Sequence, residues 1–244
     1  MNDETQIEIK PIQFWQSFII FLFPSIGVFI SIKIGIPIFK SLGLAQNVSY
    51  MLSMICILFP VLLGSIIAFR LEGNRLLLKV FFSRYRIKFL TKKDWLWILI
   101  GFVLILLFSG LLQFGVELIC KILKIKYYTV PPELGFRRIK INEWWIYLIH
   151  FFYFLCNILG EEFLYRGYLL PRQELKHGNF AWLINGGLWI MVHLGIGLSV
   201  ITMIPLLLIV PYIVQRQKNV LIGIIIHGLI AGMGFYLIAF GLIN

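Results

Sequence analysis

Long apolar runs separated by short polar segments dominate the chain, and none of them alternates between apolar and polar residues as a β-barrel strand does. Most are close to the roughly 20 residues that a helix needs to cross the hydrocarbon core of a bilayer. The sixth run contains Pro205 and Pro211, so we expect it to be broken or tilted. The apolar runs cover residues 14–38, 48–69, 95–120, 144–170, 179–194, 199–214 and 220–242. The pattern predicts an all-α, polytopic transmembrane helix bundle of about seven spans, with six to eight as the range.

Composition agrees with a membrane protein rather than with a soluble domain. Hydrophobic residues make up 60% of the 244 positions and charged residues only 14%, whereas a soluble domain has about 25% charged residues. The net charge of +11 does not indicate nucleic-acid binding, because no basic–aromatic recognition motif accompanies it. We expect the lipid bilayer and its anionic head groups to be the partner of these basic residues. Three cysteines without CxxC spacing indicate neither a disulfide framework nor a thiolate metal site.

Charge placement predicts the orientation of the chain. The loop 70–94 carries eight Lys and Arg residues, so the positive-inside rule places it, and with it the N-terminus, in the cytoplasm. The loop 121–143 is then predicted outside although it is also basic, which leaves either a re-entrant piece or a miscounted span as alternatives. We expect one membrane domain made of an exposed N-terminal tail (1–13), N-terminal helices and loops (14–143) and a C-terminal unit (144–244).

Two adjacent acids, Glu161 and Glu162, lie at the end of an almost wholly apolar stretch. An ionised carboxylate in the bilayer costs about 2.5–3.5 kcal/mol on insertion scales, so such residues mark functional sites by default. On a helix, Glu162 faces Arg166 four residues later and can pair with it, while Glu161 points about 100° away. We therefore predict that Glu161 is unpaired, on the face of Asn157, and able to act as a general base. The alternative is a charge pair that only locks two helices together.

Two histidines in later apolar segments extend the candidate site. His193 and His227 come from two further helices, and either one alone would more often be a packed core residue. Together with Glu161 they predict a polar site inside the bundle, which Asn185 can approach from the face it shares with His193. An acid and two imidazoles are also a known ligand set for catalytic zinc, so a zinc site stays open on the residues alone. No HExxH, GxSxG or phosphate-binding Gly loop occurs.

Three motifs carry a resemblance to a known family. The run 161-EEFLYRGYLLPRQE-174 resembles the EExxxR motif of the CAAX protease and bacteriocin-processing (CPBP or Abi) family of glutamic intramembrane proteases. The FxxxH motif of the family is matched as Trp189-x-x-x-His193, with Trp in place of Phe. The HxxxN motif is matched only at His227, because Ala231 stands at the Asn position. The resemblance covers roughly 144–242 and identifies the unit 144–244 as the expected catalytic core.

The resemblance implies a role for each matching residue. Glu161 and His193 would activate a water for attack on a peptide carbonyl, and Glu162 and Arg166 would support that helix. His227 would help to hold the oxyanion, a task that the family shares with the Asn missing here. Losing one oxyanion donor typically costs about 10²–10³ in rate, and we consider Asn185 or Asn157 as substitutes.

The favoured hypothesis is an intramembrane endopeptidase that acts on a membrane-associated protein or peptide without a cofactor, with zinc not expected. Bacterial members of the family are associated with peptide maturation or bacteriocin self-immunity, so the resemblance implies a bacterial cell membrane. The alternative is a catalytically weak or inactive membrane protein that acts in immunity or partner binding, which Ala231 favours. A transporter with a proton relay is a third reading, against which the absence of inverted repeats counts.

Overall fold

The structure is a computed structural model that describes residues 9–128 and 138–240, and the described residues contain helices and no β-strand. The predicted all-α polytopic bundle is confirmed. The helices are α1 (Phe14–Ile30), the π-helix η1 (Ser31–Gly35), α2 (Ile36–Ser41), α3 (Gln46–Leu71), α4 (Leu78–Arg84), α5 (Lys92–Ile122), the 3₁₀-helix η2 (Ile141–Glu143), α6 (Ile146–Glu161), the π-helix η3 (Glu162–Leu169), α7 (Leu170–His177), the 3₁₀-helix η4 (Gly178–Phe180), α8 (Ala181–His193), the 3₁₀-helix η5 (Leu194–Ser199), α9 (Val200–Gln217) and α10 (Val220–Ala239).

Each of the seven predicted apolar segments is helical over most of its described residues, and the protein is an integral membrane protein. Within the described residues, five helical stretches are long and apolar enough to cross a bilayer. The count is lower than seven because α6 to α9 follow one another as one helical stretch of 72 residues. Inside that stretch, α8 has 13 residues and extends about 20 Å at 1.5 Å per residue, which is shorter than the hydrocarbon core of about 30 Å.

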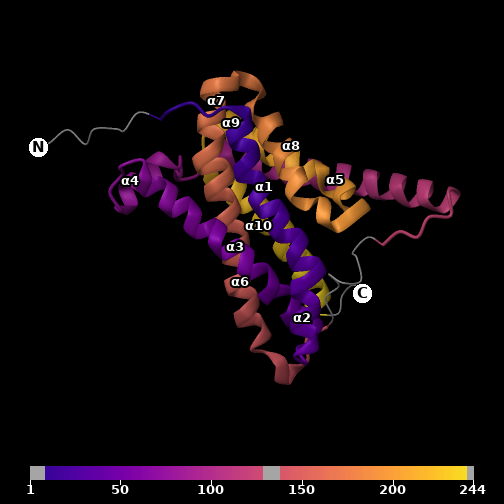
Figure 1. The fold of residues 1–244 in the computed structure, drawn as a ribbon. Coiled ribbons are helices and arrows are strands. Elements are labelled where there is room, and N and C mark those ends of the chain that lie inside the picture. The colour runs from indigo at the N-terminus through magenta and orange to yellow at the C-terminus, as the bar shows by residue number, and fades with distance from the viewer. Residues whose placement is uncertain (1–8, 129–137, 241–244) are drawn as a thin grey trace, which may run out of the picture.

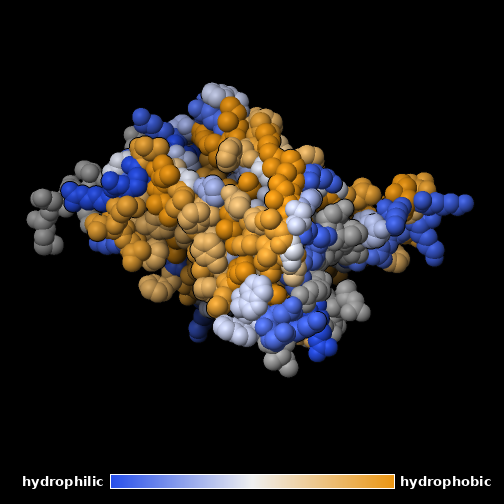
Figure 2. Space-filling model, turned by 60° about the horizontal axis from the view of Figure 1, so that its bottom comes forward, coloured by the Kyte–Doolittle hydropathy of each residue, from blue (hydrophilic) through white to orange (hydrophobic). Residues whose placement is uncertain are grey.

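The surface of the bundle is apolar, as lipid contact requires. Large hydrophobic side chains of α5 such as Leu99, Leu111 and Phe114 are exposed, while polar and charged side chains such as Glu162, Arg166 and Asn185 are fully buried. Figure 2 shows a broad hydrophobic surface over the middle of the molecule, with hydrophilic residues gathered toward its edges. This inside-out distribution follows from lipid being the solvent for most of the chain.

The helices that matter for the site are packed against one another along the bundle. α3 packs along α6, α1 along α8, and α9 against α8 and α5 (Figure 1). The loop 70–94, the segment around α7 and the connection between α9 and α10 meet at one end of the bundle. Arg86 Nη1 lies 2.8 Å from Glu174 Oε1, and Val220 N–H donates to the Arg86 carbonyl at 2.9 Å. We call this the basic end, made of residues 70–94, 172–182 and 215–220. Ile139 N–H donates to the Ala239 carbonyl at the opposite end, where α6 begins and α10 ends.

The helix α9 differs from the prediction, because it runs unbroken through both prolines. Pro205 and Pro211 lie inside Val200–Gln217, although Pro211 cannot donate to the Leu207 carbonyl four residues earlier. That carbonyl lies against Gly186 of α8, where a Cβ atom would be only 2.6 Å from the oxygen. Close packing by a neighbouring helix thus supports the proline-containing helix, as is typical of membrane proteins.

The end of the predicted exposed tail is held against the bundle. Ile12 is buried, and its N–H donates to the Arg172 carbonyl at 3.3 Å. Arg172 Nη1 in turn donates to the Lys10 carbonyl. The prediction of an exposed tail is therefore wrong for Ile12, and residues 1–8 lie outside the described residues.

Candidate active site

The two acids lie at a change of helix type. α6 ends at Glu161, and residues Glu162–Leu169 form a π-helix before α7 begins. The N–H of Leu170 accordingly donates to the Tyr165 carbonyl, five residues earlier. π-helical turns are rare and occur frequently at functional sites. The sequence predicted a helix here but not its type.

Glu162 is held by two groups from two helices. His227 Nδ1 of α10 lies 3.1 Å from Glu162 Oε1, and because an ionised carboxylate can only accept, the Nδ1–H donates. Arg166 Nη1 lies 3.6 Å from the same oxygen, so the predicted Glu162–Arg166 pair is confirmed as an ion pair rather than a direct hydrogen bond. Gly223 allows the Glu162 carboxylate to lie directly against α10, since a Cβ atom at this position would be 2.4 Å from Glu162 Oε2.

Glu161 is not unpaired as the sequence predicted. The indole N–H of Trp189 in α8 donates to Glu161 Oε2 at 2.9 Å, and His227 Nε2 lies 3.9 Å from the same oxygen. The reason for the error is physical: the helical wheel treats one helix, whereas the partner comes from α8. The signal was present in the sequence, because Trp replaces Phe in the second motif and only Trp carries a donor.

His227 therefore lies between the two acids. Its Nδ1 faces Glu162 and its Nε2 faces Glu161, and its side chain is 5% exposed. Its two ring nitrogens thus face the two acids from α10. The ring also packs against Trp189, with centroids 5.1 Å apart.

His193 faces the same group from the end of α8. Its Nδ1 lies 3.1 Å from the Trp189 carbonyl, which can only accept, so the proton lies on Nδ1 and Nε2 keeps its lone pair. The ring interacts electrostatically with Glu161 and with His227. His193 is half-buried, whereas the side chains of Glu161 and Glu162 are 3% and 0% exposed.

Arg166 is enclosed beside this cluster. Its guanidinium carbon lies 3.5 Å from the centroid of the Trp189 ring, a close cation–π contact. None of its three guanidinium nitrogens has a hydrogen-bond partner among the described residues, and neither does Glu162 Oε2. The cluster thus combines two carboxylates, one fixed cation and imidazole groups in a place of low polarity, where electrostatic interactions are strong.

The two asparagines considered as substitutes do not reach this cluster. Asn185 Nδ2 donates to the Tyr165 carbonyl and to Gln173 Oε1, each at 2.9 Å, which uses both amide hydrogens. Asn157 is partly exposed on α6, and no hydrogen bond joins it to Glu161 in the described part of the chain. Ala231 lies one turn beyond His227 on α10, so the structure supplies neither asparagine for the missing position.

Tyrosine residues from two elements complete the surroundings of Glu161. The hydroxyl groups of Tyr50 (α3) and Tyr153 (α6) are 3.2 Å apart, and both interact electrostatically with Glu161. Sequence reasoning missed these residues because tyrosine is common in apolar segments and no motif marks them.

A metal site is not formed by these side chains in the structure. Among the described residues, no three or more His, Cys, Asp or Glu side chains lie close enough together to hold a metal ion. Glu161, His193 and His227 are therefore neighbours without being a ligand set.

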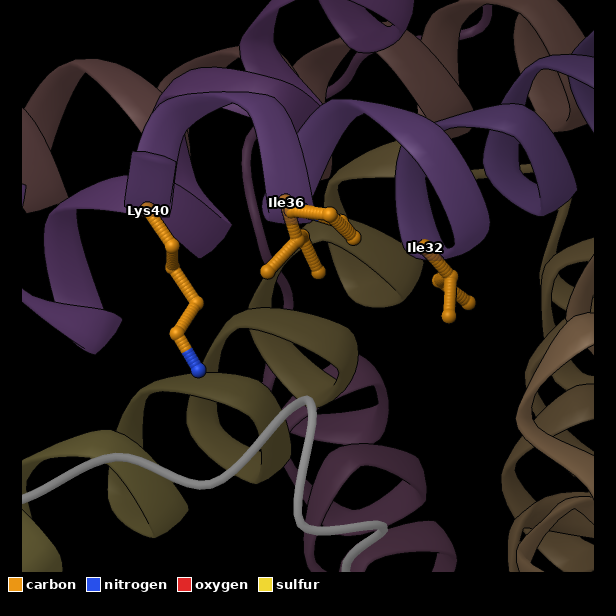
Figure 3. Close-up of a pocket in the computed structure, with 4 residues that line it drawn as sticks. Ile32, Ile36 and Lys40 are labelled. Carbon is orange, nitrogen blue, oxygen red and sulfur yellow. The ribbon is translucent and has the colours of Figure 1, made fainter. Parts of the chain in front are cut away.

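Two cavities in the described part of the chain lie away from these residues. One of about 310 Å³ is lined by Ile32, Ile36, Pro37 and Lys40 (Figure 3). Another of about 360 Å³ lies between α5, α8 and α9 and is lined only by apolar and aromatic residues, Trp182 among them. The acid cluster itself is closed, and His193 is its most exposed member.

The comparison with family models confirms the resemblance for the C-terminal part of the chain. Residues 143–233 match the Rce1-like family, described as Type II CAAX prenyl endopeptidase Rce1-like. The matched region contains both acids, Arg166, His193 and His227. No curated protein and no solved structure matches the chain.

Proposed function

We propose that this protein is an intramembrane endopeptidase that hydrolyses a peptide bond of a membrane-associated protein or peptide. The observation that carries the proposal is the convergence of Glu161, His193 and His227 from α6, α8 and α10 around one buried place. A chain gains no stability from burying such groups, since apolar replacements of buried ion pairs are often neutral or stabilising. The family match supports a protease of the CAAX type.

The arrangement fits hydrolysis by an activated water. Glu161 and the free Nε2 of His193 accept a proton from water as its oxygen bonds to the carbonyl carbon, which gives a tetrahedral intermediate. When the C–N bond breaks, this proton passes to the leaving nitrogen, and the products are a carboxylic acid, which keeps the second proton of the water, and an amine. With a proton on Nε2 as well as on Nδ1, His227 donates to the negative charge that develops on the carbonyl oxygen, and Glu162 orients its ring through Nδ1.

The same proposal covers orientation and location. The basic end includes the loop 70–94 with its eight Lys and Arg residues. We therefore place this end in the cytoplasm and the site toward that side. Glu161 and Glu162 lie nine and eight residues before Leu170, the first residue of α7, most of which belongs to the basic end. We place the protein in a bacterial cell membrane, with the N-terminus cytoplasmic and the bilayer as its lipid partner.

Purified protein in detergent tests the proposal with farnesylated CaaX peptides and unmodified hydrophobic peptides as probes. We expect the wild type to cleave at least one of them, Glu161→Gln and His193→Ala to lose cleavage, and all variants to keep a wild-type melting profile. Glu117→Gln is the matched control, because Glu117 is an exposed acid of α5 whose contact is Gln113 on the same helix.

Two outcomes would contradict the proposal. Cleavage that survives in Glu161→Gln would remove this acid from the reaction, and loss of wild-type cleavage after treatment with a chelator would favour a zinc site instead. A wild type that cleaves none of the probes would favour the alternative, an immunity or partner-binding membrane protein, for which Ala231 is the specific observation.

A further inference from the structure

One carboxylate at the basic end binds two arginines from distant parts of the chain. Glu72 accepts from Arg84 Nε at 2.7 Å and Nη2 at 2.5 Å, and from Arg172 Nη2 at 2.5 Å. The three side chains are only 6%, 9% and 14% exposed for Arg84, Glu72 and Arg172. Such a buried carboxylate needs at least one cation beside it, because an unpaired buried charge is costly.

Arg84 also reaches the helix that carries the two acids. Its Nη1 donates to the Gly167 carbonyl at 3.1 Å. In a regular helix this carbonyl would accept from residue 171, but Pro171 has no N–H to donate. The guanidinium therefore satisfies a buried carbonyl in the π-helix, five residues after Glu162.

Tyr85, next to Arg84, fills the space against the same turn. A Cβ atom at Gly167 would lie 2.1 Å from Tyr85 Cδ1, so the ring rests directly on the glycine. The Tyr85 hydroxyl donates to the Ser65 carbonyl of α3 at 2.7 Å, and the ring stacks on Phe81 of α4 at 4.4 Å. The π-helix is thus held from outside by a hydrogen bond and by a tightly packed ring.

We propose that Arg84 is a positioning residue, which acts through the Gly167 carbonyl to hold the π-helix and thereby the carboxylates of Glu161 and Glu162. This inference rests on the proposed function. Glu72 and Arg84 lie outside the family-matched residues 143–233, so the support comes from the N-terminal part of this chain. Because small displacements of catalytic groups lower turnover strongly, the loss of this contact reduces the rate more than it reduces substrate binding.

The structure allows variants that separate position from stability. In Arg84→Gln, Glu72 keeps Arg172 as its cation, so no buried charge is left alone. Arg84→Lys keeps a cation beside Glu72, but a single ammonium cannot grip the carboxylate at two points and also reach the carbonyl. Arg86→Gln is the matched control: Arg86 pairs from the same loop with Glu174 of α7, and Glu174 keeps Lys218.

Two measurements on the full-length protein in detergent test the proposal. Amide hydrogen exchange reports the π-helix directly, and we expect the amides of Glu162–Leu169 to exchange about 10-fold faster in Arg84→Gln and Arg84→Lys, but not in Arg86→Gln. Peptide cleavage should show kcat lowered about 10-fold or more in both Arg84 variants, with KM within about 2-fold of the wild type. The melting temperature of Arg84→Lys should stay near that of the wild type.

Each outcome decides the matter. If the exchange rates are unchanged in the Arg84 variants, the Arg84–Gly167 hydrogen bond does not hold the π-helix and the inference is overturned. If exchange is faster but kcat is unchanged, Arg84 has only a structural role, which also overturns the inference. Full activity in Arg84→Lys would assign the effect to charge at Glu72 rather than to the Gly167 carbonyl, which also overturns the inference. If the wild type cleaves no probe, the proposed function fails, while the exchange rates still decide whether Arg84 holds the segment.

Discussion

The substitution Gly167→Ala tests the packing of the π-helix against the basic end. The new methyl group would lie 2.1 Å from Tyr85 Cδ1 and 2.9 Å from the two neighbouring ring atoms. Carbon atoms in contact are about 3.5–4.0 Å apart, so the ring has to move by about 1.4–2 Å. Tyr85 is fully buried and its hydroxyl is bound to the Ser65 carbonyl, so it has no free direction to move in.

The expected change in the free energy of unfolding follows from three contributions. Overpacking a filled site costs about 1–3 kcal/mol, and losing the Tyr85 hydrogen bond adds about 0.5–1.5 kcal/mol. Alanine regains about 0.5–1 kcal/mol in helix propensity over glycine. The sum predicts a loss of about 0.5–4 kcal/mol, which at about 2–4 °C per kcal/mol for a chain of this size lowers the melting temperature by about 1–16 °C.

Thermal unfolding in detergent, followed by tryptophan fluorescence, measures this change. Gly64→Ala is the matched control, since a Cβ atom at Gly64 in α3 has nothing within 4 Å, and it should raise the melting temperature slightly. In a Tyr85→Ala background, Gly167→Ala should cost at least about 1 kcal/mol less, because the clashing ring is gone. Equal losses in both backgrounds, or no loss in the wild-type background, would refute the reasoning.

Three further substitutions probe the acid cluster. Glu162→Gln leaves Arg166 buried without its nearest counter-charge, so unfolding should become about 3–5 kcal/mol easier, and a melting curve that matches the wild type would contradict this. Trp189→Phe removes the indole donor to Glu161; we expect turnover to fall about 10-fold in a cleavage assay while the melting temperature changes by only a few degrees. Ala231→Asn adds a donor one turn from His227, and if the oxyanion lies there, kcat should rise by at least about 10-fold, up to the 10²–10³ that one such donor supplies.

The spans and part of the site could be predicted from the sequence because they depend on local pattern. The apolar runs predicted the helical segments, and the four-residue spacing predicted the Glu162–Arg166 pair. Both are properties of a single helix, so a helical wheel and the length of the apolar run are sufficient to predict them. The convergence of His193 and His227 with Glu161 followed from the general cost of burying ionisable groups in a membrane.

The remaining features depend on contacts between helices, which a single sequence does not encode locally. Trp189 lies 28 residues from its partner Glu161, and Arg84 lies 83 residues from Gly167. The continuous helix through Pro205 and Pro211 depends on its neighbour α8. The π-helix was missed because no residue pattern specifies it, although Pro171 showed that one carbonyl before it would lack its usual donor.

The burial of the acid cluster and the support from the basic end explain one another. Burial strengthens every electrostatic interaction within the cluster, but the buried charges of Glu161, Glu162 and Arg166 also favour any rearrangement that exposes them to solvent. The packing of Tyr85 and the Arg84 hydrogen bond oppose such a rearrangement on the side of the basic end. On the other side, the cluster ends at half-buried His193, where α8 gives way to the 3₁₀-helix η5 and Gly197 adopts a φ of +66°. The side of the cluster that packs against the basic end and the side that ends at His193 therefore differ in local structure and in exposure.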